Sequence, residues 1–365
     1  MSPDSLETTP IALIAGVDTV LLESATTDLL FDCPDLVVLK HRLLPESGHL
    51  QRIIVDQTGI LEFEEIALEH PCASCAIRED AIPTLERLIA TGRWERILFA
   101  LPIAADLPVM ARALDGAVKD GILAATTTVL SAEAARHDIL GDDTLAERGL
   151  NIADGDERSV GEALCRQLEY ADLLVVADFD IEEGLAGSEL IEHLRCHDTL
   201  RVDGIHNLNA DMLFSARHQV ESAGHRVDPR HVCAWGGGTE YGTWTLDLNS
   251  DRPFHPERLF ANIERLGTGL IRSKGRFWVP TRPNTICQWD GAGGQVSIGS
   301  YAFTEKDLPN IRLVFTGIDS RDMPRICKAF EDSLVTEAEW QEGLLAWMDF
   351  DDQLEPWLGA RIGQQ

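Results

Sequence analysis

Near the N-terminus the chain reads Ile11-Ala12-Leu13-Ile14-Ala15-Gly16, a short and nearly continuous apolar run. Such a run is typical of a strand that is buried on both faces, as in the parallel sheet of an α/β protein. Where a phosphate-binding loop would follow, the chain continues Gly16-Val17-Asp18-Thr19-Val20-Leu21-Leu22-Glu23-Ser24. A working loop is rich in glycine and carries a lysine, because converging N–H groups and a cation hold the phosphates. This stretch has a single glycine, no lysine and the anions Asp18 and Glu23, so ordinary triphosphate binding is not expected.

Apolar strands alternate with amphipathic helices through the first half of the chain. Further strands are expected at 36–39, 52–55, 96–101 and 173–177, and helices at 78–90 and 159–171, among others. The helix at 78–90 is expected to start near Glu79 or Asp80, because Pro83 is tolerated only in a first turn. The alternation predicts an α/β fold with a doubly wound, mainly parallel sheet.

The pattern changes twice in the second half. Residues 203–230 lack periodicity and are interpreted as a linker with room for one helix. From Val232 onward, period-two strands are flanked by two helices, which predicts a small α+β domain with an antiparallel sheet. The predicted division is therefore a domain over 1–202, a linker over 203–230 and a second domain over 231–365.

Bulk composition excludes several classes of protein. At 365 residues the chain exceeds the usual size of one core, so two domains are expected. No apolar run approaches the roughly 20 residues of a membrane span, and Met1-Ser2-Pro3-Asp4 lacks the basic flank of a signal peptide. A cytoplasmic location without a membrane partner follows as an expectation. The net charge of −30 repels phosphate backbones, so broad direct nucleic-acid binding is not expected.

Two cysteines three positions apart stand out in the segment His70-Pro71-Cys72-Ala73-Ser74-Cys75-Ala76-Ile77-Arg78-Glu79-Asp80. With His70 and the carboxylates of Glu69, Glu79 and Asp80 nearby, they form a compact ligand set of the kind that suits zinc. Three interpretations stay open: a metal site, a redox pair, and two cysteines that pack. The carboxylates weaken the redox interpretation, because nearby negative charge raises a thiol pKa. The other cysteines are scattered, as in a reducing compartment.

Other chemistry-bearing residues favour structural interpretations. The spacings of His206, His218, His225 and His231 suit no single helical face, so surface histidines are favoured over a metal tract. Large aromatic residues near the C-terminus are expected to pack in a core. The basic residues among them are candidates for a docking patch in an acidic protein; they are Arg252, His255, Lys274 and Arg276.

Four segments of the second half resemble, in order and spacing, the C-terminal domain of CobW-like proteins. They are Arg252-Pro253-Phe254-His255-Pro256-Glu257-Arg258-Leu259, Ser273-Lys274-Gly275-Arg276-Phe277-Trp278, Thr281-Arg282-Pro283, and Trp289 with Gly293-Gly294. Residues 157–180, including Val160-Gly161-Glu162 and Glu169-Tyr170-Ala171-Asp172, resemble the later part of that family's GTPase domain. The resemblance covers nearly the whole chain. It implies an N-terminal domain of the P-loop GTPase type with a degenerate P-loop, followed by a CobW C-terminal-like domain.

The family carries a Cys-x-Cys-Cys metal motif and is linked to metal supply, chiefly of zinc. Here the matching residues are Cys72, Ser74 and Cys75, so the middle thiol is missing. The resemblance implies that Cys72 and Cys75 are the zinc ligands. Two thiolates are too few for a closed tetrahedral site, so Glu69, His70, another carboxylate, water or a second molecule must complete it. We expect weak, exchangeable zinc, or none.

The resemblance also locates a degenerate nucleotide site at Gly16, Asp18, Thr19 and Asp180. The phosphate loop lacks Gly-Lys-Thr, and Ala100 stands where the family has its catalytic-switch glutamate, with Asp106 alone retained there. The chain has Ala177-Asp178-Phe179-Asp180 where Asn-Lys-x-Asp would read guanine. These departures imply a pseudo-GTPase without catalytic residues, for which GTP and magnesium are not expected cofactors.

An actinobacterial branch of the family shows the greatest resemblance, because it combines Cys-x-x-Cys-x-Ile/Val-Arg-x-Asp with a degenerate phosphate loop. Members of that branch are associated with zinc limitation, and some with ribosome remodelling or hibernation through a protein partner. The resemblance thus implies a zinc metallochaperone or zinc-responsive adaptor that acts on a protein, either a metal client or a ribosome-associated factor. Two rivals stay open: an active GTP-binding metallochaperone in which Asp18 or Glu23 holds magnesium, and an interaction module without metal. The sequence predicts no client and no oligomeric state.

Overall fold

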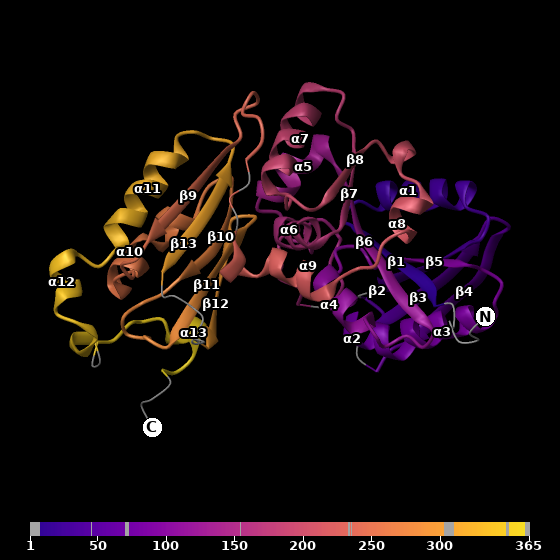
Figure 1. Cartoon of the computed structure of the whole chain (residues 1–365), viewed down its shortest axis with the longest axis horizontal. Helices are drawn as coiled ribbons and strands as arrows, with labels where there is room; N and C mark the ends of the chain where they lie inside the picture. The colour runs from indigo at the N-terminus through magenta and orange to yellow at the C-terminus, as the bar shows by residue number, and fades with distance from the viewer. Residues whose placement is uncertain are drawn as a thin grey trace, which may run out of the picture.

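The structure is a computed structural model that describes residues 8–44, 46–69, 73–153, 155–232, 234, 236–302, 310–347 and 350–361. Two sheets dominate it (Figure 1). The N-terminal sheet has eight strands in the order β4-β3-β2-β5-β1-β6-β7-β8. The strands are β1 (Thr9–Gly16), β2 (Leu36–Leu44), β3 (His49–Asp56), β4 (Gly59–Ala67), β5 (Arg96–Ala100), β6 (Gly121–Ser131), β7 (Leu173–Ala177) and β8 (Leu200–Asp203).

The central strands β2, β5, β1, β6, β7 and β8 are parallel, whereas β3 and β4 extend the sheet as antiparallel strands. Helices cover both faces, as the near-continuous apolar strands require. The helices α1 and α8 lie on one face and α3 to α6 on the other. Their bounds are α1 (Thr19–Asp32), α2 (Ala73–Ala76), α3 (Ile82–Ala90), α4 (Leu107–Leu114), α5 (Ala132–Leu140), α6 (Val160–Tyr170), α7 (Glu182–Leu194), α8 (Ala210–Phe214) and α9 (Val220–Val227).

The second sheet is antiparallel, with the strand order β12-β11-β10-β13-β9. Its far face is covered by α10 and α11, while its near face is turned toward the helices of the N-terminal domain (Figure 1). The elements are β9 (Trp244–Ser250), α10 (Pro256–Gly267), β10 (Ile271–Phe277), β11 (Thr285–Ala292), β12 (Gln295–Ala302), β13 (Ile311–Gly317), α11 (Asp322–Ser333), α12 (Glu337–Gln341) and α13 (Glu355–Leu358). The prediction of a doubly wound, mainly parallel sheet followed by an α+β domain is confirmed.

The aromatic residues of the second domain pack in its core, as predicted. Phe254, Trp278 and Trp289 are buried there together with residues of β13 and α11. Residues 203–230 carry two α-helices, α8 and α9, and both pack against elements of the first domain. Among the described residues, no helix combines the length and the apolar character needed to cross a bilayer.

Candidate functional site

Cys75 lies inside a continuous helical segment that begins at Ala73. The helix α2 passes directly into a π-helical turn, η1 (Ile77–Ala81), and then into α3. In this turn the N–H of Ile82 donates to the carbonyl of Ile77, five residues back. The predicted helix start near Glu79 or Asp80 is therefore wrong. A π-turn widens the backbone just before Pro83, which would otherwise clash with the preceding turn, so the helix extends upstream of the proline.

Cys75 lies beside the carboxylate of Glu79, which in turn contacts the backbone of Glu69. The Cys75 thiol is buried and shares a hydrogen bond with the side chain of Glu79, one helical turn away. Glu79 Oε2 also accepts the backbone N–H of Glu69 at 3.1 Å. Two further predicted ligands, His70 and Cys72, lie outside the described residues. The described structure thus brings together the Cys75 thiol and the Glu79 carboxylate and ties Glu79 to the backbone of Glu69.

The electrostatics around Cys75 suit a cationic ligand. The backbone N–H of Glu69, followed by the Arg78 guanidinium, holds the pKa of Glu79 below its ordinary value, so this group is a carboxylate at neutral pH. Arg78 Nη2 lies 3.6 Å from Cys75 Sγ, and its side chain is exposed. A thiol and a carboxylate on one helical face are ligands that zinc accepts. The spacing of four residues between Cys75 and Glu79 signals this shared face in the sequence.

Asp80 is committed to a different interaction and is not available to a metal. Its Oδ2 lies 2.8 Å from Nε2 of His41 on β2, and its Oδ1 pairs with Arg52 on β3. Burial alone would raise the pKa of Asp80, but the hydrogen bond from His41 and the charge of Arg52 outweigh it and lower that pKa. Asp80 therefore ties the π-turn to the sheet and leaves Glu79 as the carboxylate beside Cys75.

The predicted nucleotide residues lie at the carboxyl edge of the parallel strands, where α/β proteins bind ligands. Gly16 ends β1 with its Cα close to the Val129 carbonyl, since a Cβ there would stand 2.8 Å from that oxygen. Thr19 is exposed at the first position of α1, and Asp180 is exposed in the loop after β7.

Asp18 occupies the N–H groups that a phosphate would use. Its Oδ1 accepts the N–H of Val20 at 2.8 Å and that of Leu21 at 3.0 Å, so the N-terminus of α1 is capped by its own carboxylate. Glu23, the other proposed magnesium ligand, pairs with Lys40 at 2.5 Å.

Asp106 has a comparable structural role, because it caps α4 and pairs with Arg166 at 2.9 Å. The retained acidic residue therefore stabilises a helix terminus rather than standing free.

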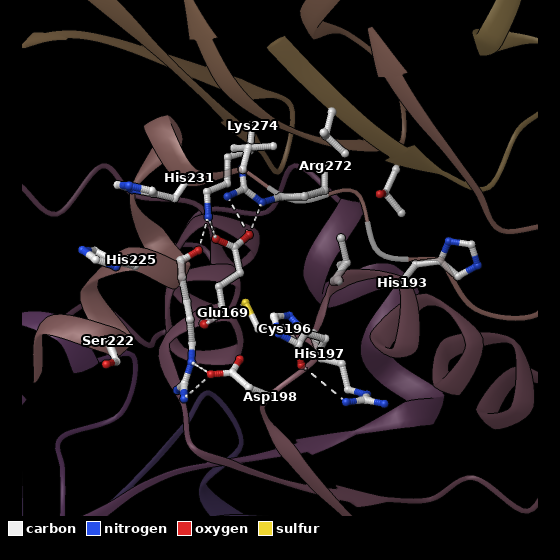
Figure 2. Close-up of a pocket in the computed structure, with 16 residues that line it drawn as sticks. Glu169, His193, Cys196, His197, Asp198, Ser222, His225, His231, Arg272 and Lys274 are labelled. Carbon is white, nitrogen blue, oxygen red and sulfur yellow. Dashed lines mark hydrogen bonds and ion pairs between the residues drawn. The ribbon is translucent and has the colours of Figure 1, made fainter. Parts of the chain in front are cut away.

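A cavity of about 230 Å³ lies between the two domains (Figure 2). Its lining includes Glu169 of α6, Cys196, and Arg272 and Lys274 of β10. Glu169 Oε1 accepts from Arg272 Nε at 2.9 Å, and Oε2 accepts from Lys274 Nζ at 2.7 Å. Figure 2 shows both cationic side chains pointing at this carboxylate. Burial raises the pKa of Cys196 to about 11, so its thiol stays protonated at neutral pH.

These contacts contradict the prediction of a basic docking patch. Lys274 is bound to Glu169 and to the Arg226 carbonyl. Arg276 donates to the Arg230 carbonyl at 2.7 Å and Arg252 to the Val335 carbonyl at 2.9 Å, while His255 is buried. The cations hold parts of the chain together instead of forming a free surface.

The histidines of 206–231 do not form a metal tract, but one of them is not at the surface either. His218 is buried, with Nδ1 2.6 Å from Asp172 Oδ2 and Nε2 3.1 Å from the Tyr170 hydroxyl. His225 and His231 stack at 4.5 Å between ring centroids. Across the part of the chain that the structure describes, no group of three or more His, Cys, Asp or Glu side chains is placed to hold a metal.

Comparison with known proteins supports the assignment of the second domain. Residues 243–334, which run from the start of β9 to the end of α11, match the model of the cobalamin synthesis protein cobW C-terminal domain. A mainly parallel α/β domain followed by this antiparallel domain defines the class of protein. The chain is similar to CobW-like proteins, and the family match lies in its second domain.

Two curated relatives match over 80% of this chain. One is the zinc chaperone Rv0106 of Mycobacterium tuberculosis, 28% identical, with 73% of its length covered. The other is the zinc-regulated GTPase metalloprotein activator 1 of Dictyostelium discoideum, 24% identical, with 70% of its length covered. A solved structure, the Zn(II)-bound YjiA GTPase from E. coli, aligns over 90% of this chain and 99% of its own length, at 12% identity and a TM-score of 0.38.

Proposed function

We propose that this chain handles zinc, accepting the ion at Cys72 and Cys75 and passing it to a protein client, without GTP chemistry. The observation that carries the proposal is the contact between the Cys75 thiol and the Glu79 carboxylate, which the backbone N–H of Glu69 also holds. The names of the curated relatives, a zinc chaperone and a zinc-regulated activator, support zinc as the ion. Glu79 joins Glu69 and His70 as a candidate to complete the ligand set.

The chemistry of this donor set favours exchange over storage. A site of two thiolates and carboxylate oxygens lacks the four soft or imidazole ligands of a closed structural zinc site, so an incoming client ligand finds an open position. Glu79 is ionised at neutral pH and lies beside the thiol, where it helps to neutralise a bound cation. The six cysteines in the described part of the chain form no disulfide with one another, which suits the cytoplasm as the place of action.

A zinc titration tests the proposal directly. In the apo-protein, Cys72→Ser and Cys75→Ser are each expected to weaken the tightest zinc site by about a hundredfold, and Glu79→Gln by about tenfold, because each removes an anionic ligand. Affinity should fall as the pH is lowered, since thiolates must lose protons to bind. Competition with a chromophoric chelator measures these constants.

The matched control is Cys327→Ser, which changes a partly buried cysteine of α11 and should leave zinc affinity unchanged. Equal affinity in wild type, Cys72→Ser and Cys75→Ser would sink the proposal.

The loss of nucleotide chemistry is a separate expectation. The Asp18 carboxylate already holds the N–H groups of Val20 and Leu21, and Glu23 is paired with Lys40. Calorimetry with GTP and magnesium, with and without zinc, is therefore expected to show no binding. A dissociation constant below about 10 μM would instead favour the active GTPase.

The client is proposed to be a protein. The resemblance stated from the sequence makes ribosome-associated factors of zinc-starved cells the first clients to test. Comparing proteins co-purified from zinc-starved and zinc-replete cells addresses this part of the proposal.

A further inference from the structure

The strand β4 ends the large sheet on the side far from the C-terminal domain (Figure 1). It pairs with β3, and among the described residues no strand pairs with its other edge. Free edges invite pairing with another chain, and proteins usually blunt them with short strands or charges. Although β4 carries glutamates, it runs for nine residues and exposes two large apolar side chains, Ile60 at 67% and Phe63 at 56%, so the edge keeps the length and apolar surface that pairing needs.

The strand register places Ile60 and Phe63 on one face. Ile60 pairs with Val55 and Phe63 with Ile53, and a bulge between these pairs keeps the two side chains on the same side. The opposite face of β4 is already used, since Glu62 binds Arg87 and Glu64 binds Arg52. The helix α1, which covers the sheet on the exposed face, lies against β1, β2 and β6.

The charge of the strand selects the kind of partner. β4 reads Gly59-Ile60-Leu61-Glu62-Phe63-Glu64-Glu65-Ile66-Ala67, with three glutamates and no basic residue. Glu65 is exposed on the same face as Phe63. A second copy of this chain would bring the same glutamates and another net charge of −30 to the edge, which opposes self-pairing. A strand rich in lysine or arginine would meet complementary charge at Glu65, the glutamate of the exposed face.

We propose that β4 is the docking edge for a basic, extended segment of the zinc client, which adds to the sheet as a further strand. The proposal rests on the zinc-handling function proposed above. β4 ends at Ala67, two residues before Glu69, so a strand added to it leads to the side of the sheet where Cys75 and Glu79 lie. Main-chain hydrogen bonds supply affinity in this mode, and side chains at alternate positions supply selectivity.

A zinc-free peptide assay tests the edge. The probe is a short synthetic peptide in which lysine alternates with valine, and the comparison peptide has glutamate in place of every lysine. The lysine peptide is expected to bind, to protect β4 amides from hydrogen exchange and to bind more weakly as salt increases. Phe63→Ser and Glu65→Lys are each expected to weaken this binding about tenfold.

Two matched variants control for general loss of apolar surface and of charge. Leu345→Ser changes another exposed apolar residue, in the C-terminal domain, and Glu183→Lys another exposed glutamate, at the start of α7; both should bind the peptide as wild type does. Equal binding of the two peptides, no protection of β4, or undiminished binding by Phe63→Ser would overturn the proposal. A dimer that Phe63→Ser abolishes would overturn it too, in favour of a second copy at the edge. Because zinc is absent, these results are independent of the zinc titration of Cys75→Ser.

Discussion

Replacing Glu169 with glutamine is expected to loosen the two domains from each other and to lower the free energy of unfolding by about 3–5 kcal/mol. Glu169 is only 6% exposed and Arg272 only 3%. The substitution removes the charge that both Arg272 and Lys274 face, so Lys274 loses its carboxylate partner and Arg272 keeps only Asp290. Breaking one side of a buried ion pair is costly, because the remaining charge stays desolvated.

The contact acts between domains because its partners come from elements of different domains. Glu169 lies on α6 of the first domain, whereas Arg272 and Lys274 lie on β10 of the second. Lys274 also donates to the Arg226 carbonyl at the end of α9, and Arg272 also donates to the Gly291 carbonyl of β11. Urea denaturation measures the loss of stability, and the radius of gyration from small-angle X-ray scattering measures the separation of the domains.

Glu162, which also lies on α6, offers a control, because its replacement by glutamine is expected to have the opposite effect on stability. Burial and the charge of Asp290 raise the pKa of Glu162, so the folded protein disfavours its charged form. Glu162→Gln is therefore expected to leave stability unchanged or slightly increased. If Glu169→Gln matched Glu162→Gln in both measurements, the ion pairs would not hold the domains together.

Acid should reproduce the effect of Glu169→Gln in the wild-type protein. Burial alone would raise the pKa of Glu169, but Arg272 and Lys274 hold it below the ordinary value of 4.5. A carboxylate with a lowered pKa stabilises the fold above its unfolded-state pKa, and this contribution is lost as the pH falls through the folded-state value. Domain separation in wild type is thus expected only below about pH 4.5.

The parallel core could be predicted because each of its strands is marked by a short stretch of the sequence itself. Strands buried on both faces need continuous apolar runs, and β1, β5 and β7 have them. The strand β4 was not predicted, because its residues alternate apolar and acidic side chains at a free edge. The π-turn before Pro83 was also missed, since a proline inside a helical pattern ordinarily marks a helix start.

Half of the candidate site could be predicted from spacing, and the rest depends on the tertiary fold. The cysteine pair and the acidic residues around it are visible in the sequence, but only the helical register shows that Glu79 faces Cys75 while Asp80 faces the sheet. The contact between Glu169 and Arg272 joins residues about a hundred positions apart. A charged pair so distant in sequence leaves no pattern in composition or periodicity, so the basic residues of β10 suggested a free patch.

Asp80→Asn is expected to lower the free energy of unfolding by about 3 kcal/mol and to weaken zinc binding at Cys75. Asp80 is 4% exposed and is the anion shared by His41 and Arg52. Asparagine keeps the shape but removes the charge, so Arg52 loses its buried partner and retains only the glutamates of β4. Because Asp80 ties the π-turn to β2 and β3, its loss lets the segment that carries Cys75 move. Urea denaturation and the zinc titration measure the two effects.

The pH dependence of stability distinguishes the buried contact of Asp80 with His41 from an ordinary surface charge. Burial lowers the pKa of His41 below its ordinary value of 6.5, so the folded protein holds the neutral imidazole. The unfolded chain binds a proton at His41 more readily, and wild-type stability should therefore decline as the pH falls below about 6.5. A second loss of stability should follow below about pH 3.8, as Asp80, whose pKa is lowered, becomes protonated.

The control Glu65→Gln changes an exposed carboxylate of β4 and should shift the free energy of unfolding by less than about 0.5 kcal/mol. Equal urea midpoints for Asp80→Asn and Glu65→Gln would show that the link between the π-turn and the sheet does not stabilise the candidate metal site.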